Sequence, residues 1–369
     1  MLLLFIPLWT GCQSLSLPSA SVPIESLVLK KSGTRFTIMA DTRAQQIDFP
    51  EFVDILKMSH LANGVFDQKM RQMIQLHAKP NPERQSVFIR SSERLHGSLR
   101  ALSPHVRDPG ILPNNPTDFN SLVISLFDTL LLAPDFEIKF AAAGDSSHIF
   151  NLLQAHIKLS EFKSRFVPIS DGVELQKNEL TQGEFFQLFG FNPANFSENN
   201  FCQTGESNYE SIRGTEICSS MPVESIAWND VQVLLQILNR KIEHFRFSLP
   251  TMAQWQFAVL GRISEPTDDD LLPNLDEQAW WLSNSKKQSR SVGTRQPSAT
   301  GAHDLLGNVW ELMADKPQQW AQPNIMAMRG GSWGSIHRAA LKLSNVRAVD
   351  KEFRGYQIGF RLTRKSKTH

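Results

Sequence analysis

Three cysteines are the residues of this sequence whose chemistry depends most on their surroundings. Cys12 ends a short apolar N-terminal run, whereas Cys202 and Cys218 lie near each other in a polar segment that contains Gly and Ser. A cysteine can carry a lipid, form a disulfide or bind a metal ion. No His or Cys stands at a zinc-like spacing from Cys202 or Cys218, so a metal site there is disfavoured.

The N-terminal run ends in Thr10-Gly11-Cys12 and resembles a bacterial lipoprotein signal, in which the cysteine thiol is acylated after cleavage. We therefore predict a signal over residues 1–12, lipidation of Cys12, and a flexible Ser- and Pro-rich tether over 13–30. A buried N-terminal strand is the alternative. The predicted location is the cell envelope of a bacterium, lipid-anchored to the periplasm-facing side of the outer membrane.

Export would place the two remaining cysteines in an oxidising compartment. A disulfide between Cys202 and Cys218 would then close the polar loop and stabilise it by about 3 kcal/mol in the chain-entropy model. Two free thiols are the alternative. The disulfide is our prediction.

Length and composition limit the classes of function. The chain has 369 residues, of which 41% are hydrophobic, which is enough for two or three packed domains. The net charge of +1 gives no electrostatic reason to expect a nucleic-acid partner. Residues 31–160 read as a small α/β domain without a chemical motif, with a strand over 136–140, another over 86–90, and helices over 119–131 and 147–159.

The second half contains clear helix boundaries. Thr181 and Glu184 form a capping box, and Thr251 and Gln254 form another; each is followed by a glycine at the expected helix end. A third helix between them should begin at Asn229 or Asp230, because apolar residues then recur at helical spacing. Gly, Asn, Ser and Trp dominate after this point, which indicates irregular backbone held by aromatic packing.

Several ordered blocks of the second half resemble one family. They lie at 178–185, 222–230, 247–258, 304–311, 329–333 and 359–361, and they are similar in order to blocks of the formylglycine-generating enzymes, or sulfatase-modifying-factor family. The resemblance covers residues 167–364. It implies the irregular α+β fold of that family, which is related to C-type lectin-like domains.

The resemblance also implies a calcium loop at 304–311. Carboxylates of Asp304 and Glu311, with backbone carbonyls of Gly307 and Val309, would supply the oxygen ligands that Ca²⁺ prefers. Read without the family, Asp304 caps a turn and Glu311 pairs with an arginine. Calcium as a structural cofactor is the expectation taken from the resemblance.

The family's oxidase acts through two cysteines that follow the Gly-Gly-Ser-aromatic element and bind copper. Here the corresponding positions fall at Ser335, with Ile336 as the alternative, and at Ala340. A hydroxyl and a methyl group do not replace soft thiolate ligands of Cu(I), so no copper is expected. Formylglycine generation by the family's route is therefore disfavoured, and we assign no catalytic residue.

A surface groove is expected near the same element. Trp333, His337 and Arg338 are its candidate lining residues. Three arginines of the C-terminal region should mainly fix irregular loops, and a clamp for a substrate anion is the alternative: Arg329, Arg347 and Arg361. The predicted function is an envelope lipoprotein whose domain is a non-catalytic binding or scaffold module for an envelope protein, a peptide or a glycan. The alternative is a divergent oxidoreductase of the same family that does not use a cysteine–copper site.

Overall fold

The computed structural model describes the second half of the chain almost continuously and the first half in part. The described residues are 26–32, 35–40, 43–47, 51, 54, 58, 61, 136–141, 151, 154–155, 159, 162–170, 172–202, 209–212, 215–262 and 274–367.

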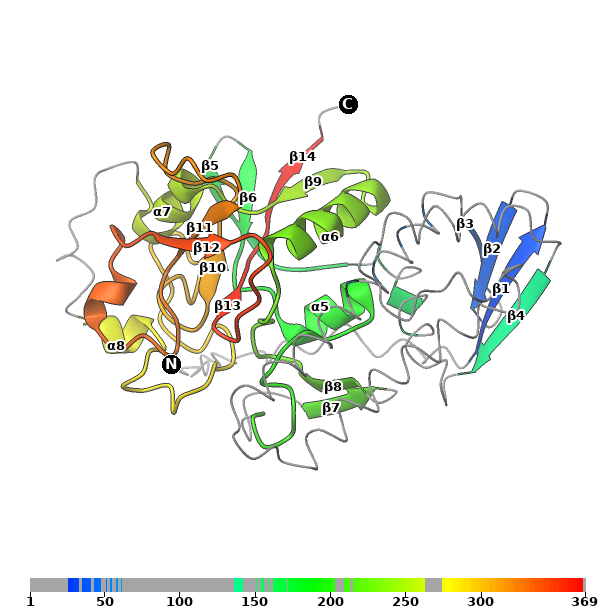
Figure 1. Cartoon of the computed structure of the whole chain (residues 1–369), viewed down its shortest axis with the longest axis horizontal. Coiled ribbons are helices and arrows are strands. Elements are labelled where there is room, and N and C mark those ends of the chain that lie inside the picture. Colours follow the sequence, from blue (N-terminus) through cyan, green and yellow to red (C-terminus); the bar gives the residue numbers. More distant parts are fainter. Residues whose placement is uncertain are drawn as a thin grey trace, which may run out of the picture.

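Two small sheets and a hairpin organise the C-terminal region (Figure 1). One sheet has the order β5-β6-β14-β9, with β5 at Phe166–Ser170, β6 at Val173–Gln176, β14 at Thr363–Ser366 and β9 at Phe245–Ser248. The other has the order β12-β11-β10-β13, with β12 at Arg347–Asp350, β11 at Ile325–Arg329, β10 at Trp310–Leu312 and β13 at Ile358–Gly359. The hairpin pairs β7 (Tyr209–Ile212) with β8 (Thr215–Cys218). The short strands and long irregular segments form the α+β fold that the sequence predicts.

Both predicted capping boxes form. Helix α5 (Gln182–Phe189) begins after Thr181, whose side chain accepts from the Glu184 amide, and α7 (Met252–Leu260) begins after Thr251 in the same way. Each helix ends at a glycine with positive φ, a conformation that favours glycine because it has no Cβ.

The prediction for the start of α6 was wrong by one or two residues. The helix spans Trp228–Lys241, so Asn229 and Asp230 lie inside its first turn. Asp230 still supports the start, because its carboxylate accepts from the amide of Ala227 at 2.9 Å. Ala227 has no side-chain acceptor of its own, and this reversed contact explains why a carboxylate was mistaken for the cap. A short helix α8 (Leu275–Gln278) and a 3-10 helix η6 (Arg338–Leu341) complete the described helices of this region.

The apolar face of α6 packs into the main core. Val231, Leu234, Ile237 and Leu238 are almost fully buried there, at the helical spacing that the sequence predicts. They pack with residues of α5, β10 and β13 in one cluster. A second cluster surrounds Trp255 of α7, which has no exposed surface. These two clusters hold the sheets and the irregular loops together.

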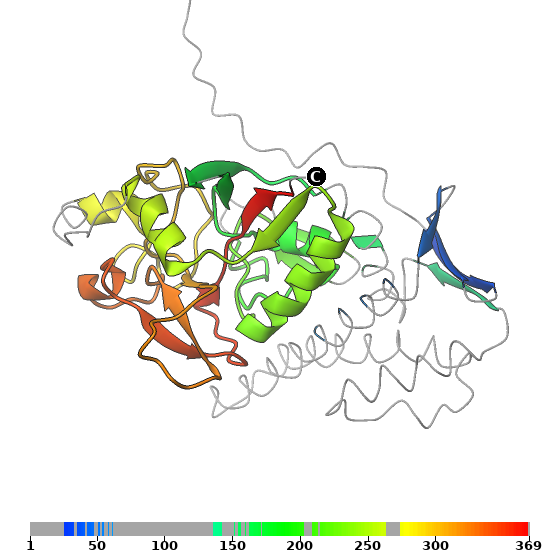
Figure 2. The ribbon, with the colours of Figure 1, turned by 90° about the horizontal axis from the view of Figure 1, so that it is seen from above.

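A four-stranded antiparallel sheet lies at the other end of the molecule, beyond α6 and α5 (Figures 1 and 2). Its order is β3-β2-β1-β4, with β3 at Arg43–Ile47, β2 at Arg35–Ala40, β1 at Ser26–Ser32 and β4 at Phe136–Ala141. Strand β4 confirms the strand predicted over 136–140. The predicted tether over 13–30 is too long, because residues from 26 onward pair within β1. The predictions over 1–12, 86–90 and 119–131 lie outside the described residues.

The first half of the chain contacts α6. Arg240 binds the buried carboxylate of Asp54 at 2.8 Å, and Lys241 binds Glu51 at 2.6 Å. Met58 and Leu61 belong to the same apolar cluster as the α6 face. None of the helices in the described part of the chain combines the length and apolar character needed to cross a membrane.

Candidate functional site

A pocket of about 380 Å³ lies beside η6. Its lining combines residues of the 334–340 segment with Trp310 of β10 and Arg347 of β12, together with Asn345 and Gln357. Ser335 and Ala340, the two positions predicted to replace the family's cysteines, both line this pocket. Ser335 and Ala340 were identified only by their alignment with the family's cysteines, and the structure places both in one pocket.

Two glycines shape the turn that leads into the pocket. Gly330 and Gly331 both have positive φ, at 95° and 80°. A Cβ on Gly330 would lie 2.6 Å from the carbonyl oxygen of Leu305, so no other residue fits without moving the backbone. This turn directs the chain so that Ser332 is fully buried and Ser335 reaches the pocket.

A hydrogen-bond network orders the polar side chains of the pocket. The Ser335 hydroxyl accepts from the amide of Ser332 at 3.0 Å. The Ser332 hydroxyl accepts from the amide of Gly334 at 3.3 Å and donates to Gln357 Oε1 at 2.6 Å. The Asn345 side chain donates to the carbonyl of Ala340 at 2.8 Å. These bonds hold the pocket's polar groups in one arrangement.

The three predicted groove residues separate in the structure. His337 lines the pocket, and its side chain is exposed. Trp333 is only 7% exposed, and its ring stacks on Tyr356 at 5.8 Å between centroids. Arg338 is not among the lining residues; its guanidinium lies 5.9 Å from the ring of Trp281. Of the three, His337 alone faces this pocket.

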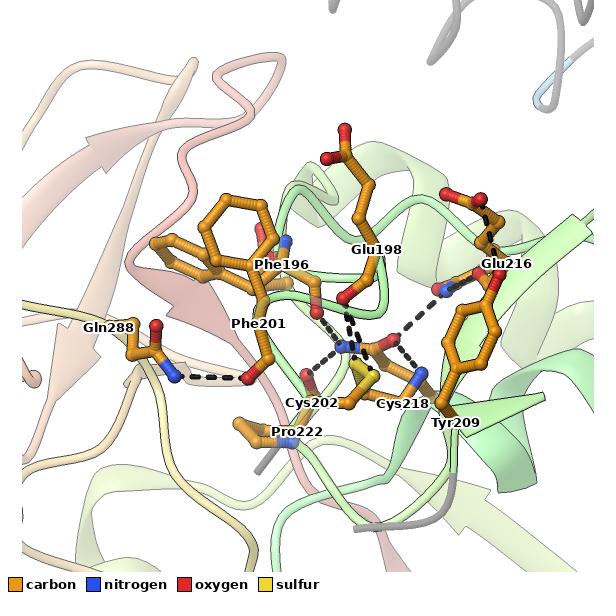
Figure 3. The surroundings of a disulfide bond; sticks show 12 residues. Phe196, Glu198, Phe201, Cys202, Tyr209, Glu216, Cys218, Pro222 and Gln288 are labelled. Atoms are coloured by element: carbon orange, nitrogen blue, oxygen red, sulfur yellow. Dashed lines mark hydrogen bonds between the residues drawn. A yellow bond between two sulfur atoms is a disulfide. The ribbon is translucent and has the colours of Figure 1, made fainter. Parts of the chain in front are cut away.

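The Cys202–Cys218 disulfide forms, as the sequence predicts. It lies in a small apolar cluster with Phe196, Met221 and Trp333 (Figure 3). Phe196 meets the ring of Trp333 edge to face at 5.5 Å. The disulfide and Phe196 therefore share a cluster with Trp333, the residue that directly precedes the pocket segment.

A buried ion pair lies at the end of the predicted calcium loop. Arg361 and Glu311 have no exposed side-chain surface, and the guanidinium binds both carboxylate oxygens, at 2.6 and 2.9 Å. Glu311 also accepts from the indole of Trp255 at 3.1 Å. Burial raises the pKa of Glu311, and the Arg361 charge opposes this effect. The alternative pairing of Glu311 with an arginine is the arrangement observed.

The model of the sulfatase-modifying factor enzyme 1-like domain matches residues 161–366, which is more than half of the chain. The protein belongs to this family. Its fold is accordingly the α+β fold of the sulfatase-modifying-factor domain. The match extends a few residues beyond the predicted range of 167–364 at both ends.

Two related proteins are named as inactive members of the family. The chain is 28% identical over 123 residues to inactive C-alpha-formylglycine-generating enzyme 2 of Bos taurus, and 28% identical over 124 residues to that of Mus musculus. The matches cover 30% and 31% of this chain and 38% of each relative. The chain thus matches well under half of the length of these relatives.

Solved structures with a similar fold include two bacterial proteins. Treponema denticola variable protein 1 aligns with a TM-score of 0.44 and 18% identity, over 55% of this chain and 91% of that one. PvdO from Pseudomonas aeruginosa aligns with a TM-score of 0.42 and 19% identity, over 56% of this chain and 85% of that one.

The sulfatase-modifying-factor copper site does not fit this chain. Ser335 and Ala340 offer no sulfur ligand, and Cys202 and Cys218 are joined to each other. Across the ranges that the structure describes, no three His, Cys, Asp or Glu residues are placed to hold a metal ion. We therefore derive no oxygen-activating step through copper.

The predicted calcium loop fits in part. Asp304 is 2% exposed, and its Oδ1 has no hydrogen-bond partner, which suits a cation ligand. Burial raises its pKa to about 6. Glu311 suits calcium less well, because Arg361 already binds both of its oxygens. Calcium at Asp304, Gly307, Val309 and Glu311 stays a prediction.

Sequence reasoning did not connect the polar lining residues Asn345 and Gln357 with this pocket. It considered Arg347 for an anion clamp without placing it in the pocket, and it gave Trp310, which is 5% exposed, no role in a site. Asn345, Arg347 and Gln357 lie in segments without a motif. Their proximity follows from the pairing of β11 with β12 and of β10 with β13, which no local pattern indicates.

Proposed function

We propose that the sulfatase-modifying-factor domain of this protein is a non-catalytic binding module and that the pocket beside η6 is its ligand site. One observation carries the proposal. A pocket lies at the position that aligns with the family's cysteine pair, and Ser335 and Ala340 line it in place of thiols. A pocket without thiolate ligands is suited to binding rather than to copper-dependent oxidation.

The polar groups of the pocket also lack a nucleophile–base pair. The Ser335 hydroxyl is held by the Ser332 amide, and among the described residues no imidazole or carboxylate bonds to it. A serine without a neighbouring base is a weak nucleophile. The relatives named as inactive enzymes support the same conclusion.

We further propose that the protein is a lipid-anchored envelope protein and that its ligand belongs to an envelope protein, peptide or glycan. The Thr10-Gly11-Cys12 ending supports this proposal. Metabolic labelling with a radioactive fatty acid tests the anchor: the label should enter the wild-type protein and be absent from the Cys12→Ser variant. Equal labelling of both forms would remove the anchor from the proposal.

Filling the pocket tests the binding function. Ala339 is exposed and lines the pocket, so Ala339→Trp should fill it without disturbing the core. Ala348, an exposed residue of β12 outside the lining, is the matched control. Cross-linking of the full chain in bacterial envelopes should recover a partner with wild type and Ala348→Trp and lose it with Ala339→Trp. Recovery by all three forms would refute the pocket as the ligand site.

A divergent oxidoreductase is the second candidate. The pocket's polar lining, which includes His337, Asn345 and Gln357, is the observation that favours it. Metal analysis of the purified protein separates the two candidates. Stoichiometric copper or iron, or conversion of a sulfatase-derived thiol peptide to its aldehyde, would replace the binding proposal with catalysis.

A further inference from the structure

Two polar side chains of the pocket beside η6, Gln357 and Ser335, present hydrogen-bond donors to it. Because the Ser332 hydroxyl accepts from the Gly334 amide, its own proton is directed to Gln357 Oε1. The Gln357 carbonyl oxygen is thereby occupied, and its NH₂ group remains as the free end of the amide. Within the part of the chain that the structure describes, this NH₂ group has no protein acceptor.

Ser335 adds a second donor. Its oxygen accepts from the Ser332 amide, and its hydroxyl proton has no acceptor among the described residues. Ser335 is 7% exposed and lines the pocket, so its hydroxyl can donate to a ligand there. A ligand atom that accepts from Ser335 and from the half-buried Gln357 would gain two hydrogen bonds from the pocket.

Arg347 supplies the pocket's formal positive charge. Its guanidinium carbon lies over the ring of Trp310, 5.3 Å from the ring centroid, in a cation–π contact. A cation–π contact uses the charge of the guanidinium and none of its N–H groups as hydrogen-bond donors, so these groups remain available to a ligand. Within the described ranges, no carboxylate pairs with Arg347, and no Asp or Glu lines the pocket. A ligand anion would therefore meet no competing acid.

We infer that the pocket binds a carboxylate attached to an aliphatic group, with Arg347, Gln357 and Ser335 as its donors; this inference rests on the proposed binding function. The planar fork of an arginine matches the two oxygens of a carboxylate. One guanidinium balances the single charge of a carboxylate, whereas a phosphate dianion would require further cations. The aliphatic part would contact Ile336, Ala339 and Ala340, and Ile336 is 66% exposed.

Two pairs of probes test the inference with the full chain. N-acetyl-leucine represents the C-terminus of a peptide, and 4-methylpentanoate represents a free aliphatic acid. Each is compared with its primary amide, which has the same shape and no charge. Affinities are measured by titration with NMR detection of the ligand. Each acid should bind at least roughly ten times more tightly than its amide, because a charge-assisted hydrogen bond is stronger than a neutral one.

Substitutions identify the group responsible. Arg347→Gln should weaken acid binding by roughly 10- to 100-fold and leave amide binding unchanged. Arg347→Lys keeps the charge without the fork and should recover part of the loss. Arg338→Gln is the matched control, because Arg338 is an exposed neighbour outside the lining. Its acid affinity should equal that of wild type.

The outcomes separate this inference from the proposed function. Equal binding of acids and amides, or an Arg347→Gln variant that keeps the acid preference, overturns the carboxylate assignment. If Ala339→Trp nevertheless abolishes recovery of the partner in envelope cross-linking, the proposed binding function still holds and only the carboxylate assignment fails. If neither probe pair binds and cross-linking is insensitive to Ala339→Trp, both proposals fail. A preference for N-acetyl-leucine over 4-methylpentanoate supports a peptide C-terminus as the source, and the reverse preference supports a free acid.

Discussion

Arg361 is the most informative residue to change, because it joins three segments of the sulfatase-modifying-factor domain. Its guanidinium donates to both oxygens of Glu311, to the carbonyls of Gln176 and Lys177, and to the carbonyl of His303. The side chain has no exposed surface. Arg361→Met keeps most of the side chain's volume and removes every one of these donors.

The expected loss of stability follows from the buried acceptors that lose their arginine donor in Arg361→Met. A buried carboxylate that loses its cation costs about 3–5 kcal/mol. The carbonyl oxygens left without donors add to this cost, although not additively. Glu311 keeps its bond from Trp255, and its pKa, already raised by burial, should rise further. We expect Arg361→Met to lower the free energy of unfolding by about 4 kcal/mol and Tm by roughly 10 °C.

Urea unfolding followed by tryptophan fluorescence measures this change. All eight tryptophans except Trp9 lie between residues 228 and 333, so the signal reports on the sulfatase-modifying-factor domain. Arg364→Met is the matched control, because Arg364 pairs with Glu174 at 2.6 Å in a partly exposed position. That change should cost about 1 kcal/mol or less. If the two variants differ by less than about 1 kcal/mol, the buried pair does not organise the domain as we argue.

Three further predictions concern stability. Reducing the Cys202–Cys218 disulfide, which joins residues 16 apart, should destabilise the protein by about 3 kcal/mol, seen as a lower Tm with reductant. Calcium added after chelation should raise Tm in wild type, and this increment should vanish in Asp304→Ala. Burial raises the pKa of Glu184 above its ordinary value of 4.5, so between the two pKa values the folded protein binds more protons than the unfolded protein. The free energy of unfolding should therefore fall as pH rises from about 4.5 through the raised pKa. Glu184→Gln keeps the cap to Thr181 and should flatten this decline in urea unfolding.

Each of these predictions has a distinct contradictory result. A double Cys202→Ser, Cys218→Ser variant should be insensitive to reductant, and sensitivity there would point to another cause. A calcium increment that persists in Asp304→Ala would place the ion elsewhere. Parallel pH profiles for wild type and Glu184→Gln would remove Glu184 as the titrating group.

The sequence predicted the local features of the domain well. Thr181 and Thr251 were identified as caps because a capping box depends on residues three positions apart. The family blocks identified the fold for the same reason: each is a short, contiguous pattern. The start of α6 was misplaced because Asp230 caps the amide of Ala227 from inside the helix and also binds Arg354, 124 residues away.

The site was less predictable because distant segments form it. Ser335 and Ala340 could be found from their spacing after the Gly-Gly-Ser-aromatic element. Arg347 could be considered for an anion clamp, but its place in the pocket, like that of Gln357, could not be predicted, since only the pairing of short strands brings the two residues together. The role of Glu311 was left open between calcium and arginine, and the choice depends on Arg361, 50 residues further along the chain.

The central position of β14 has a consequence for how the protein is made. This strand lies between β6 and β9, and its Arg364 pairs with Glu174, 190 residues earlier. During synthesis, β6 and β9 therefore leave the ribosome long before the strand that joins them. The sheet can close only once translation has passed Ser366, and contacts of such long range form slowly. Until then this sheet stays open, and premature termination before Thr363 would leave β6 and β9 without their shared partner strand and exposed to aggregation.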